Sequence, residues 1–384
     1  MIAAFFLKKN SILIVHPIKE FSGSLKSIEE YVKLLKNKYE FIFLTPKGLS
    51  SKRLSKFGRV IQVWGLSKFD NSQLGYYKNL RWLLIIREVV FLFPTILAAL
   101  YIKFKFKKLS IIHFNEITLI PTIYIFKSFF QIPFVLHCRI LFKKDNYFGK
   151  KIIKFINKNI NKVIVIDNDV KDSFPKSFKT EIVRNIFIKE NFIKLKKNSE
   201  YLNLGYLGSF LKYKGLEDLI KAINNLNKKN YKIRLFLAGN FIRKNFIIEK
   251  LNLSNNVSEK ILINKNIILL GHLNNLKKFY QKIDILCFPS YLNALGRQVF
   301  EAGMYSIPSI VCIKKNSDSF INYRTGLSFK NPGSLKILEK KIIFFYNQRY
   351  KIKKMGKEAK KLMIKNYDIN KNKIKLDRIY QRLI

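Results

Sequence analysis

With 384 residues, the chain is longer than one ordinary domain and fits two domains of about 150–200 residues each. Hydrophobic residues make up 48% of it, which is enough for real cores and excludes wholesale disorder. Lysine and arginine number 73 against 25 aspartate and glutamate residues, and the resulting charge of +48 is extreme for a metabolic enzyme.

Two explanations of this charge remain open. One is codon bias, because the chain is crowded with the residues expected of an AT-rich genome; the other is a selected attraction to an anionic surface. Among anionic surfaces, the cytoplasmic leaflet of a membrane is favoured, since no RNA-binding signature of interleaved basic and aromatic residues stands out. We therefore expect an anionic membrane surface as a partner, and no nucleic acid.

The cysteines and histidines are too dispersed to indicate a metal site or a disulfide framework. Cys138, Cys287 and Cys312 form no CxxC pair, and the four histidines lie equally far apart. A reducing cytoplasm is the simplest setting for such a chain. The short apolar run Ala3–Leu7 is followed rather than preceded by lysines, so no secretory signal is predicted.

One stretch tests the membrane hypothesis. Trp82–Ile102 is largely apolar, but Arg87-Glu88 interrupts it, and the uninterrupted part, Val89–Ile102, has 14 residues. A helix that spans a bilayer needs about 20. We expect a buried or interfacial helix, which the lysines from Lys103 to Lys108 would allow to dock on a bilayer without crossing it, as a protein peripheral to the inner face of the cell membrane.

Strand and helix signals alternate through both halves, which predicts two parallel, doubly wound sheets. The expected strands are Ile12–Val15, Phe41–Leu44, Val60–Trp64, Ile111–Phe114, Phe134–Leu136 and Val163–Ile166, then Leu202–Leu207, Ile233–Ala238, Ile267–Leu270, Ile285–Phe288 and Ser309–Ile313.

The predicted organisation is a domain over residues 1–187, a polar, lysine-rich linker over 188–200, a second domain over 201–366 and a terminal helix over 367–384. The stretch from Lys340 to the end reads as helical, with a break near Asn366-Tyr367.

Two strand–loop–helix units in the second half predict an anion site. The loop Gly208–Gly215 follows one strand and offers Lys214, and the loop Pro289–Gly296 follows another and leads into a helix that carries Glu301. Both loops would lie at the carboxyl ends of parallel strands, where such sheets bind ligands. A helix start opposite a flexible lysine suits a pyrophosphate, and a carboxylate one to two turns along can accept both ribose hydroxyls.

Two other features, the segment Asp167–Asp169 and His137, each allow a structural and a functional interpretation. Asp167-Asn168-Asp169 matches a metal-binding DxD pattern, but it stands between a strand and a helix, so N-capping of the helix is favoured. His137 ends the strand Phe134–Leu136 at the ligand edge of the first sheet, where a structural role and a ligand contact are both open.

The second half resembles the family 4 (group 1) glycosyltransferases of the GT-B fold, which link two Rossmann-like domains across a cleft. The matching segments are Gly205–Phe210 with Lys214-Gly215-Leu216, Leu237-Ala238-Gly239-Asn240, Asn266–Gly271, Pro289–Gly296 with Glu301-Ala302-Gly303-Met304, and the end of the chain from Lys357. Weaker matches in the first half are Gly23-Ser24, His137 and Val183–Ile186.

The resemblance implies a retaining, metal-independent transferase that moves a sugar from a nucleotide diphosphate to a glycan or lipid-linked acceptor in surface polysaccharide or lipopolysaccharide assembly. It assigns the diphosphate to Lys214, the ribose to Glu301, the donor sugar to Asn293 and His137, and the acceptor side to Gly23 and Ser24. It places the nucleotide against Gly208, Ser209, Lys212, Gly239, Leu295, Gly296 and Arg297. No cofactor other than the sugar donor is implied, and the terminal helix is expected to cross back to the first domain.

Two positions depart from the family pattern. The family has paired glutamates eight residues apart, and the first of them falls on Asn293 here; an arginine commonly stands where this chain has Ser209. These departures motivate an alternative hypothesis, a non-catalytic GT-B protein that binds a nucleotide sugar or scaffolds a membrane assembly. A third hypothesis, nucleic-acid binding, would show as tight and strongly salt-dependent binding to DNA.

Overall fold

The structure is a computed structural model that describes residues 9–73, 77, 79–188, 200–239, 264–273 and 275–384. It divides into two compact units, one made of the chain up to Ile186 together with Ile369–Ile384, and the other of Phe187–Asp368. Most of the predicted linker 188–200 lies outside the described residues.

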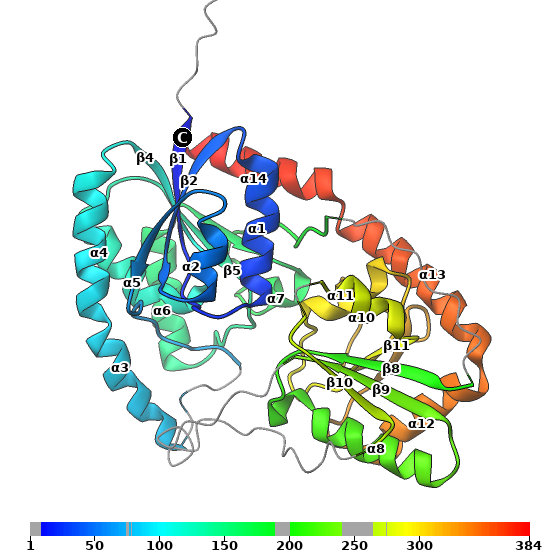
Figure 1. Cartoon of the computed structure of the whole chain (residues 1–384). Helices are drawn as coiled ribbons and strands as arrows, with labels where there is room; N and C mark the ends of the chain where they lie inside the picture. The colour runs from blue at the N-terminus through cyan, green and yellow to red at the C-terminus, as the bar shows by residue number, and fades with distance from the viewer. Residues whose placement is uncertain (1–8, 74–76, 78, 189–199, 240–263, 274) are drawn as a thin grey trace, which may run out of the picture. The chain divides into compact units, whose positions relative to one another are not determined.

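The first unit contains a seven-stranded parallel sheet in the order β3-β2-β1-β4-β5-β6-β7 (Figure 1). Its strands are β1 (Asn10–Val15), β2 (Tyr39–Pro46), β3 (Arg59–Val63), β4 (Leu109–Phe114), β5 (Phe134–Cys138), β6 (Lys162–Val165) and β7 (Thr180–Ile182). Its helices are α1 (Gly23–Leu35), α2 (Leu49–Leu54), α3 (Leu84–Val90), α4 (Leu92–Lys105), α5 (Ile120–Phe129), α6 (Tyr147–Asn159), α7 (Asn168–Asp172) and α14 (Ile369–Leu383), with 3-10 turns η1 (Asn79–Leu83) and η2 (Ile117–Leu119).

Alternation along the strands sends successive side chains to opposite faces of this sheet. In β1, Leu13 and Val15 pack into the core that also contains residues of α4, α5 and α6, whereas Ile12 and Ile14 pack into the core shared with α1 and α14. The sheet is therefore covered by helices on both sides, as a doubly wound fold requires.

The second unit contains a six-stranded parallel sheet in the order β10-β9-β8-β11-β12-β13. Its strands are β8 (Leu202–Leu207), β9 (Ile233–Ala238), β10 (Ile267–Gly271), β11 (Ile285–Phe288), β12 (Ser309–Cys312) and β13 (Gly326–Phe329). Its helices are α8 (Leu216–Lys228), α10 (Lys277–Lys282), α11 (Arg297–Met304), α12 (Leu335–Asn347) and α13 (Arg349–Asn366), with the 3-10 turn η3 (Lys212–Lys214).

Each predicted strand has its counterpart in these sheets, and the predicted terminal helix breaks at Tyr367, between α13 and α14. Helix α14 belongs to the first unit, although the residues before it belong to the second (Figure 1). On the first unit it packs Leu376, Ile379 and Tyr380 against the α1 face of the sheet. The chain thus crosses back to its N-terminal unit, as predicted.

Candidate functional site

The carboxyl ends of β8 and β11 form the switch point of the second sheet. β8 pairs with β9 on one side and with β11 on the other, so the connections that leave these two neighbouring strands run in opposite directions. Ligands of open parallel sheets bind at such a point. The predicted loops Gly208–Gly215 and Pro289–Gly296 both begin here.

These two loops are in direct contact. The backbone N–H of Tyr291 donates to the carbonyl of Tyr213 at 2.9 Å. Gly215 adopts φ +73°, and a Cβ atom there would lie 2.0 Å from the carbonyl oxygen of Pro289. Only glycine accommodates both the left-handed backbone and this close approach, so Gly215 joins the loops and begins α8.

A second pair of glycines packs the loops after β8 and β9 together. The N–H of Gly208 donates to the carbonyl of Ala238 at 3.0 Å. A Cβ atom on Gly239, whose φ is +142°, would lie 1.9 Å from the carbonyl oxygen of Gly208. The predicted nucleotide positions Gly208 and Gly239 therefore lie side by side.

Lys214 lies at the end of η3, in the loop after β8. Its Nζ is 5.4 Å from the ring centroid of Tyr213 and 5.6 Å from that of Phe288, so two aromatic faces flank the ammonium group. Burial lowers the pKa of Lys214. Because burial has removed water from this ammonium group, a bound anion would stabilise its charge in place of the lost water. Lys212, two residues earlier, is exposed.

Helix α11 begins at the end of the second loop. Its N-cap residue, Gly296, has an extended backbone and no side chain with which to cap the helix; Leu295 before it is half-buried. In this position the first N–H groups and the positive end of the helix dipole can face an anion.

Glu301 lies five residues after Gly296, between one and two helical turns, and is 2% exposed. One carboxylate oxygen accepts from Nε of Arg297 at 2.8 Å, and the other accepts from the hydroxyl of Tyr280 at 3.0 Å. Burial, with the charge of Glu301, raises the pKa of Tyr280. In this arrangement the carboxylate is held inside the unit, and binding a ribose would require these bonds to be exchanged. Its ribose role stays a prediction.

The two departures from the family pattern lie on the same loops. Asn293 is exposed, and its Oδ1 accepts the backbone N–H of Lys314 at 2.8 Å. The carbonyl of Ser209 accepts the hydroxyl of Tyr206 at 2.9 Å. Asn293 thus connects its loop to the segment after β12.

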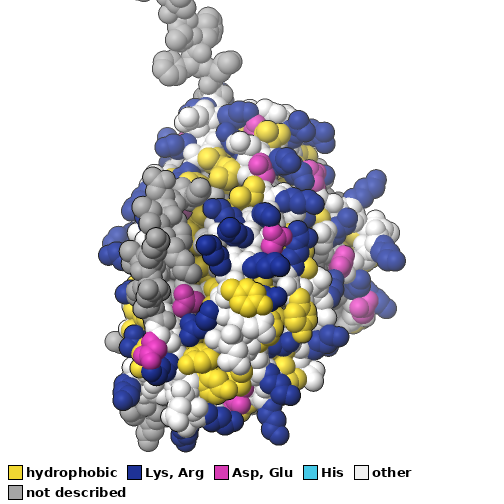
Figure 2. Space-filling view, turned by 90° about the vertical axis from the view of Figure 1, so that its right-hand side faces the viewer, with side chains coloured by type: hydrophobic (Ala, Val, Ile, Leu, Met, Phe, Trp, Pro, Cys, Tyr) yellow, Lys and Arg dark blue, Asp and Glu magenta, His cyan; other side chains and the backbone are white. Residues whose placement is uncertain are grey.

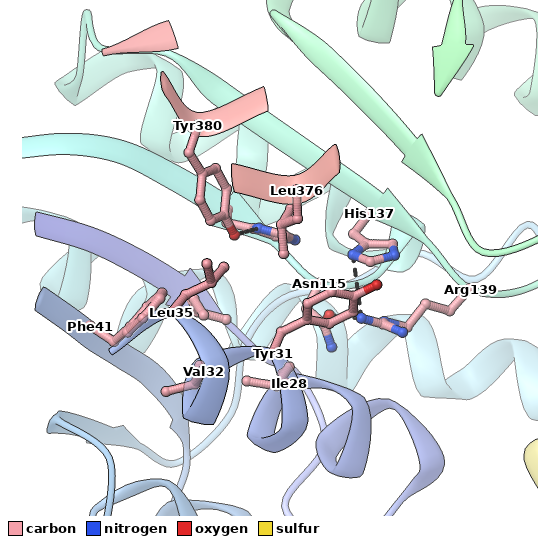
Figure 3. A pocket seen from close by; sticks show the side chains of 12 residues that line it. Ile28, Tyr31, Val32, Leu35, Phe41, Asn115, His137, Arg139, Leu376 and Tyr380 are labelled. Atoms are coloured by element: carbon pink, nitrogen blue, oxygen red, sulfur yellow. Dashed lines mark hydrogen bonds between the residues drawn. The ribbon is translucent and has the colours of Figure 1, made fainter. Parts of the chain in front are cut away.

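The first sheet has its own switch point, between β1 and β4, and a buried polar cluster lies there (Figure 3). Arg139 donates through Nε to Asn115 at 2.9 Å and through Nη1 to Asn185 at 3.0 Å, and its Nη2 lies 3.3 Å from Nδ1 of His137. His137 is 1% exposed, so its predicted contact with the donor sugar would require the ring to be uncovered.

Burial keeps the histidines of this cluster neutral. It lowers the pKa of His16 and of His113 to about 3, with a smaller contribution from the charge of Arg139. The same two causes, with His113, lower the pKa of His137 well below its usual range.

Sequence reasoning missed His16, Asn115 and Arg139 at this edge. His16 and Asn115 come directly after expected strands, and Arg139 follows β5, which extends two residues beyond the expected strand Phe134–Leu136. This position is the signal that finds them, because the carboxyl ends of parallel strands meet at one edge. Gly23 and Ser24, the predicted acceptor positions, form the first turn of α1, which Ser22 caps by accepting the N–H of Leu25 at 3.1 Å.

The DxD-like segment is a helix cap, as favoured from the sequence: Asp167 accepts the N–H of Val170 at 2.7 Å at the start of α7. Within the described part of the chain, no group of three or more His, Cys, Asp or Glu side chains is placed to hold a metal ion. The predicted metal independence stays a prediction.

Comparison with known proteins shows which class of enzyme the second unit resembles. Residues 187–362, nearly the whole second unit, match the family model of glycosyl transferases, group 1. The capsular polysaccharide biosynthesis glycosyltransferase CapM of Staphylococcus aureus is 25% identical over 161 residues, 41% of this chain and 40% of CapM. Protein CapJ of the same organism is 26% identical over 188 residues, 45% of this chain and 46% of CapJ. The matched segments thus span less than half the length of these curated relatives.

Solved structures match over both units. Anabaena Alr3699/HepE, crystallised with UDP, has a TM-score of 0.72 at 14% identity and covers 97% of this chain and 100% of its own. The lipopolysaccharide outer core galactosyltransferase WaaB has a TM-score of 0.64 at 15% identity, over 97% and 100% of the two chains. These likenesses, with the two parallel-sheet units, define the GT-B fold. Over residues 187–362, somewhat less than half of the chain, the protein thus matches the glycosyl transferases of group 1.

Proposed function

We propose that the protein is a retaining glycosyltransferase that moves a sugar from a nucleoside diphosphate to a glycan or lipid-linked acceptor in the assembly of a surface polysaccharide. The observation that carries the proposal is the junction of the β8 and β11 loops, where Gly215 brings the loop of Lys214 against Pro289. This junction places a desolvated cation on one loop of the switch point and an uncapped helix start on the other.

The chemistry of the transfer suits these groups. The bond between the anomeric carbon and the diphosphate oxygen breaks, the acceptor oxygen bonds to that carbon, and the acceptor proton passes to the departing phosphate. Negative charge grows on the diphosphate, and preorganised donors that stabilise it are worth several kcal/mol of barrier, on the order of 3 kcal/mol for one donor. Lys214 and the start of α11 would supply this stabilisation without a side-chain nucleophile.

Uridine nucleotides are the first donors to test. Structures of HepE were solved with UDP and with UDP-glucose, and this chain shares their fold. The capsular polysaccharide assignment of CapM supports a surface glycan as the product class. We expect the donor sugar to be selected at the loop Pro289–Gly296, where Asn293 carries an amide in place of the carboxylate of the family pattern.

The test combines binding with turnover. A thermal-shift screen against nucleoside diphosphates and nucleotide sugars, with and without Mg²⁺, should show a metal-independent rise in Tm for one nucleotide, because ligands that bind only the folded state stabilise it. Release of the nucleoside diphosphate is then measured with the donor that binds. The Lys214→Ala variant should lose about 10²–10³-fold in turnover.

Lys228→Ala, which removes an exposed lysine at the end of α8, is the matched control and should keep full turnover. Equal turnover of the two variants would remove Lys214 from the site. Metal-independent binding with no turnover for any donor and acceptor would establish the non-catalytic alternative, for which Asn293 and the internally paired Glu301 are the reasons.

A further inference from the structure

The helical run from η1 through α4 exposes most of its apolar surface. Leu80–Lys105 has 26 residues and is long and apolar enough to cross a membrane by length and composition. Its most apolar stretch has a mean hydropathy of 2.2, yet only 22% of that stretch is buried within the unit. Of the two predicted alternatives, a buried helix does not fit most of this run, whereas an interfacial helix does.

The exposed apolar side chains recur every three or four residues, so they form one stripe along the run. From Trp82 onward they are Trp82, Ile85, Ile86, Val89, Val90, Phe93, Ile96, Leu97, Tyr101 and Phe104. Phe93 and Phe104 are the most exposed, at 65% and 72%. We call this set the apolar stripe. Figure 1 shows α3 and α4 as one long rod along the first unit.

The opposite side of the run packs against the first unit and forms hydrogen bonds with it. Ala98, Ala99 and Ile102 pack in the core with α5. Thr95 accepts the backbone N–H of Ser67 at 3.1 Å, and the Ser67 hydroxyl donates to the carbonyl of Glu88 at 2.8 Å. The same polar strip includes Glu88, the acidic residue that interrupts the run.

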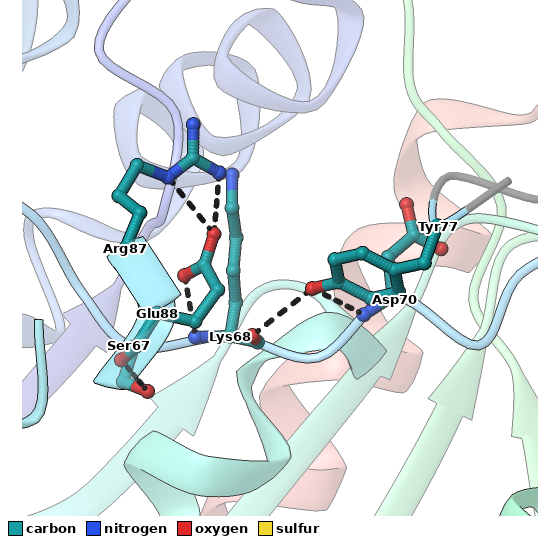
Figure 4. A network of polar contacts seen from close by, with 6 residues as sticks. All are labelled: Ser67, Lys68, Asp70, Tyr77, Arg87 and Glu88. Atoms are coloured by element: carbon teal, nitrogen blue, oxygen red, sulfur yellow. Dashed lines mark hydrogen bonds and ion pairs between the residues drawn. The ribbon is translucent and has the colours of Figure 1, made fainter. Parts of the chain in front are cut away.

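Glu88 is turned inward rather than to solvent (Figure 4). It is 5% exposed, accepts the backbone N–H of Lys68 at 3.2 Å and forms an ion pair with Arg87. Carrying this carboxylate and its partners into hydrocarbon would cost several kcal/mol, on the order of 3 kcal/mol for the acid alone. The anchored polar side therefore holds the run on the first unit, with the apolar stripe facing outward.

The charges around the stripe are positive. Between Leu80 and Lys108 the acidic residue Glu88 is buried, whereas Lys103, Lys105, Lys107 and Lys108 are exposed at the end of α4. Lysine and arginine side chains are also spread widely over the face drawn in Figure 2, so charge alone selects no surface. The combination of an apolar stripe with lysines at its end is what distinguishes this one.

Both tryptophans of the chain lie at this surface. Trp64, 86% exposed at the end of β3, lines an open groove of roughly 500 Å³ with Phe93, Leu97 and Tyr101, and Trp82 stands at the start of the stripe with 55% exposure. Tryptophan and tyrosine concentrate where hydrocarbon meets headgroups, because their rings are apolar and their N–H or O–H groups need a polar partner.

We propose that the apolar stripe, with Trp64 and the lysines after α4, is a docking surface for an anionic lipid bilayer, on which the η1–α4 run lies in the plane of the headgroups. The apolar side chains enter the acyl boundary, and the lysines meet the phosphates. This surface belongs to the first unit alone, so the proposal stands independently of the transfer reaction.

The test uses the whole chain and its own tryptophans. Vesicles of phosphatidylcholine with phosphatidylglycerol should shift the emission of Trp64 and Trp82 to shorter wavelength and co-sediment the protein, and pure phosphatidylcholine should bind at least tenfold less. The double variant Phe93→Ser/Phe104→Ser should lose at least tenfold in partitioning onto the anionic vesicles.

The matched control is Tyr323→Ser/Tyr350→Ser, which removes two rings of similar exposure, 63% and 66%, from the second unit. It should bind vesicles as the unchanged protein does. Circular dichroism melting confirms that both double variants fold; if the stripe variant does not, Lys103→Gln/Lys105→Gln/Lys107→Gln/Lys108→Gln replaces it, with the same tenfold loss expected.

Several results would overturn the proposal. Absence of an emission shift and of sedimentation with anionic vesicles would do so, as would equal losses in the stripe and control variants. Sedimentation velocity that showed a dimer abolished by Phe93→Ser/Phe104→Ser would assign the stripe to a second copy of the chain. Protein that stays in the vesicles after alkaline carbonate washing would instead show a run that crosses the bilayer.

Discussion

The position of Gly215 requires glycine for two reasons, its left-handed backbone and its close contact with a neighbouring loop. Another glycine of the same unit, Gly271, shares only the first of them. Gly215 has φ +73° and a Cβ there would meet Pro289, whereas Gly271 has φ +66° and a Cβ added to it would have no atom within 4 Å. A left-handed backbone costs an L-residue about 1–2 kcal/mol at either position. Only at Gly215 would the neighbouring loop also be displaced.

We therefore expect Gly271→Ala to lower the free energy of unfolding by about 1 kcal/mol and Gly215→Ala by about 3 kcal/mol or more. Gly215→Ala should also abolish the nucleotide-induced rise in Tm, which Gly271→Ala should keep. Urea unfolding and the thermal shift measure the two effects. Similar losses of stability and intact nucleotide binding in both variants would show that the loop junction is not needed for binding.

The pairing of Glu301 shows what residue spacing can and cannot predict. Arg297 is four residues before Glu301 on one helix, so their ion pair follows from helical periodicity. Tyr280, which supplies the second hydrogen bond, comes from α10, a different element 21 residues away along the chain. Spacing places Glu301 on the correct helix, but its inward orientation depends on how α10 packs, which the sequence pattern does not contain.

At the scale of elements, apolar runs were sufficient to predict the buried strands. The strands that escaped prediction, β7 and β13, are short, and β7 is half-buried throughout with two polar residues among its three. For the run Leu80–Lys105 the sequence left a buried and an interfacial helix open, for the opposite reason. It is apolar on nearly every side, so its sequence resembles a buried helix. The inward bonds of Glu88 and Thr95, with the packing of Ala98, Ala99 and Ile102, decide which side faces the protein.

Hydrogen bonds and an ion pair, which the sequence pattern did not predict, connect helix α14 to the rest of the first unit. The Tyr380 hydroxyl lies 2.6 Å from Nδ1 of His113, and Asp377 accepts the hydroxyl of Tyr39 at 2.8 Å and pairs with Lys38. These three interactions join α14 to β2, to the residue just before β2, and to β4. Removing one partner of a buried bond leaves the other unsatisfied in a place that water does not reach.

Tyr380→Phe should therefore lower the free energy of unfolding of the first unit by about 1–3 kcal/mol. Tyr350→Phe, which removes a hydroxyl from an exposed ring on α13, should change it by less than about 0.5 kcal/mol. Urea unfolding followed by tryptophan emission measures this unit specifically, because Trp64 and Trp82 both belong to it. Equal stabilities of the two variants would mean that the bond to His113 contributes nothing.

At the scale of the whole molecule, stability should fall on acidification. The folded-state pKa of His16 and of His113 is about 3 and that of His137 is also lowered, against a usual value of 6.5, so the unfolded chain binds more protons as the pH drops below 6.5. The stability from keeping these rings neutral is complete above pH 6.5 and is lost toward pH 3.

Glu116 acts in the opposite direction. Burial raises the pKa of Glu116 from 4.5 to about 7, with smaller opposing effects from Arg139 and Ser24. Between pH 4.5 and pH 7 the folded chain therefore keeps a proton on this carboxyl that the unfolded chain has lost. This contribution to stability disappears as the pH rises through that range. Between pH 4.5 and 6.5, unfolding lets three histidines take up protons and lets Glu116 release one, a net uptake of about two protons. The free energy of unfolding should therefore fall by about 2–3 kcal/mol for each pH unit of acidification.

His16→Gln should reduce this uptake to about one proton and so halve the slope, because one of the three buried rings is gone. Glu116→Gln should steepen the slope toward three protons, since the opposing carboxyl is removed. His272→Gln, at an exposed position of the second unit, is the control and should leave the slope unchanged. Urea unfolding at a series of pH values from 4.5 to 7, followed through the tryptophans of the first unit, measures all three. If His16→Gln and Glu116→Gln gave the slope of the unchanged protein, the buried cluster would not control the acid stability of this unit, and the source of any pH dependence would lie among its surface charges.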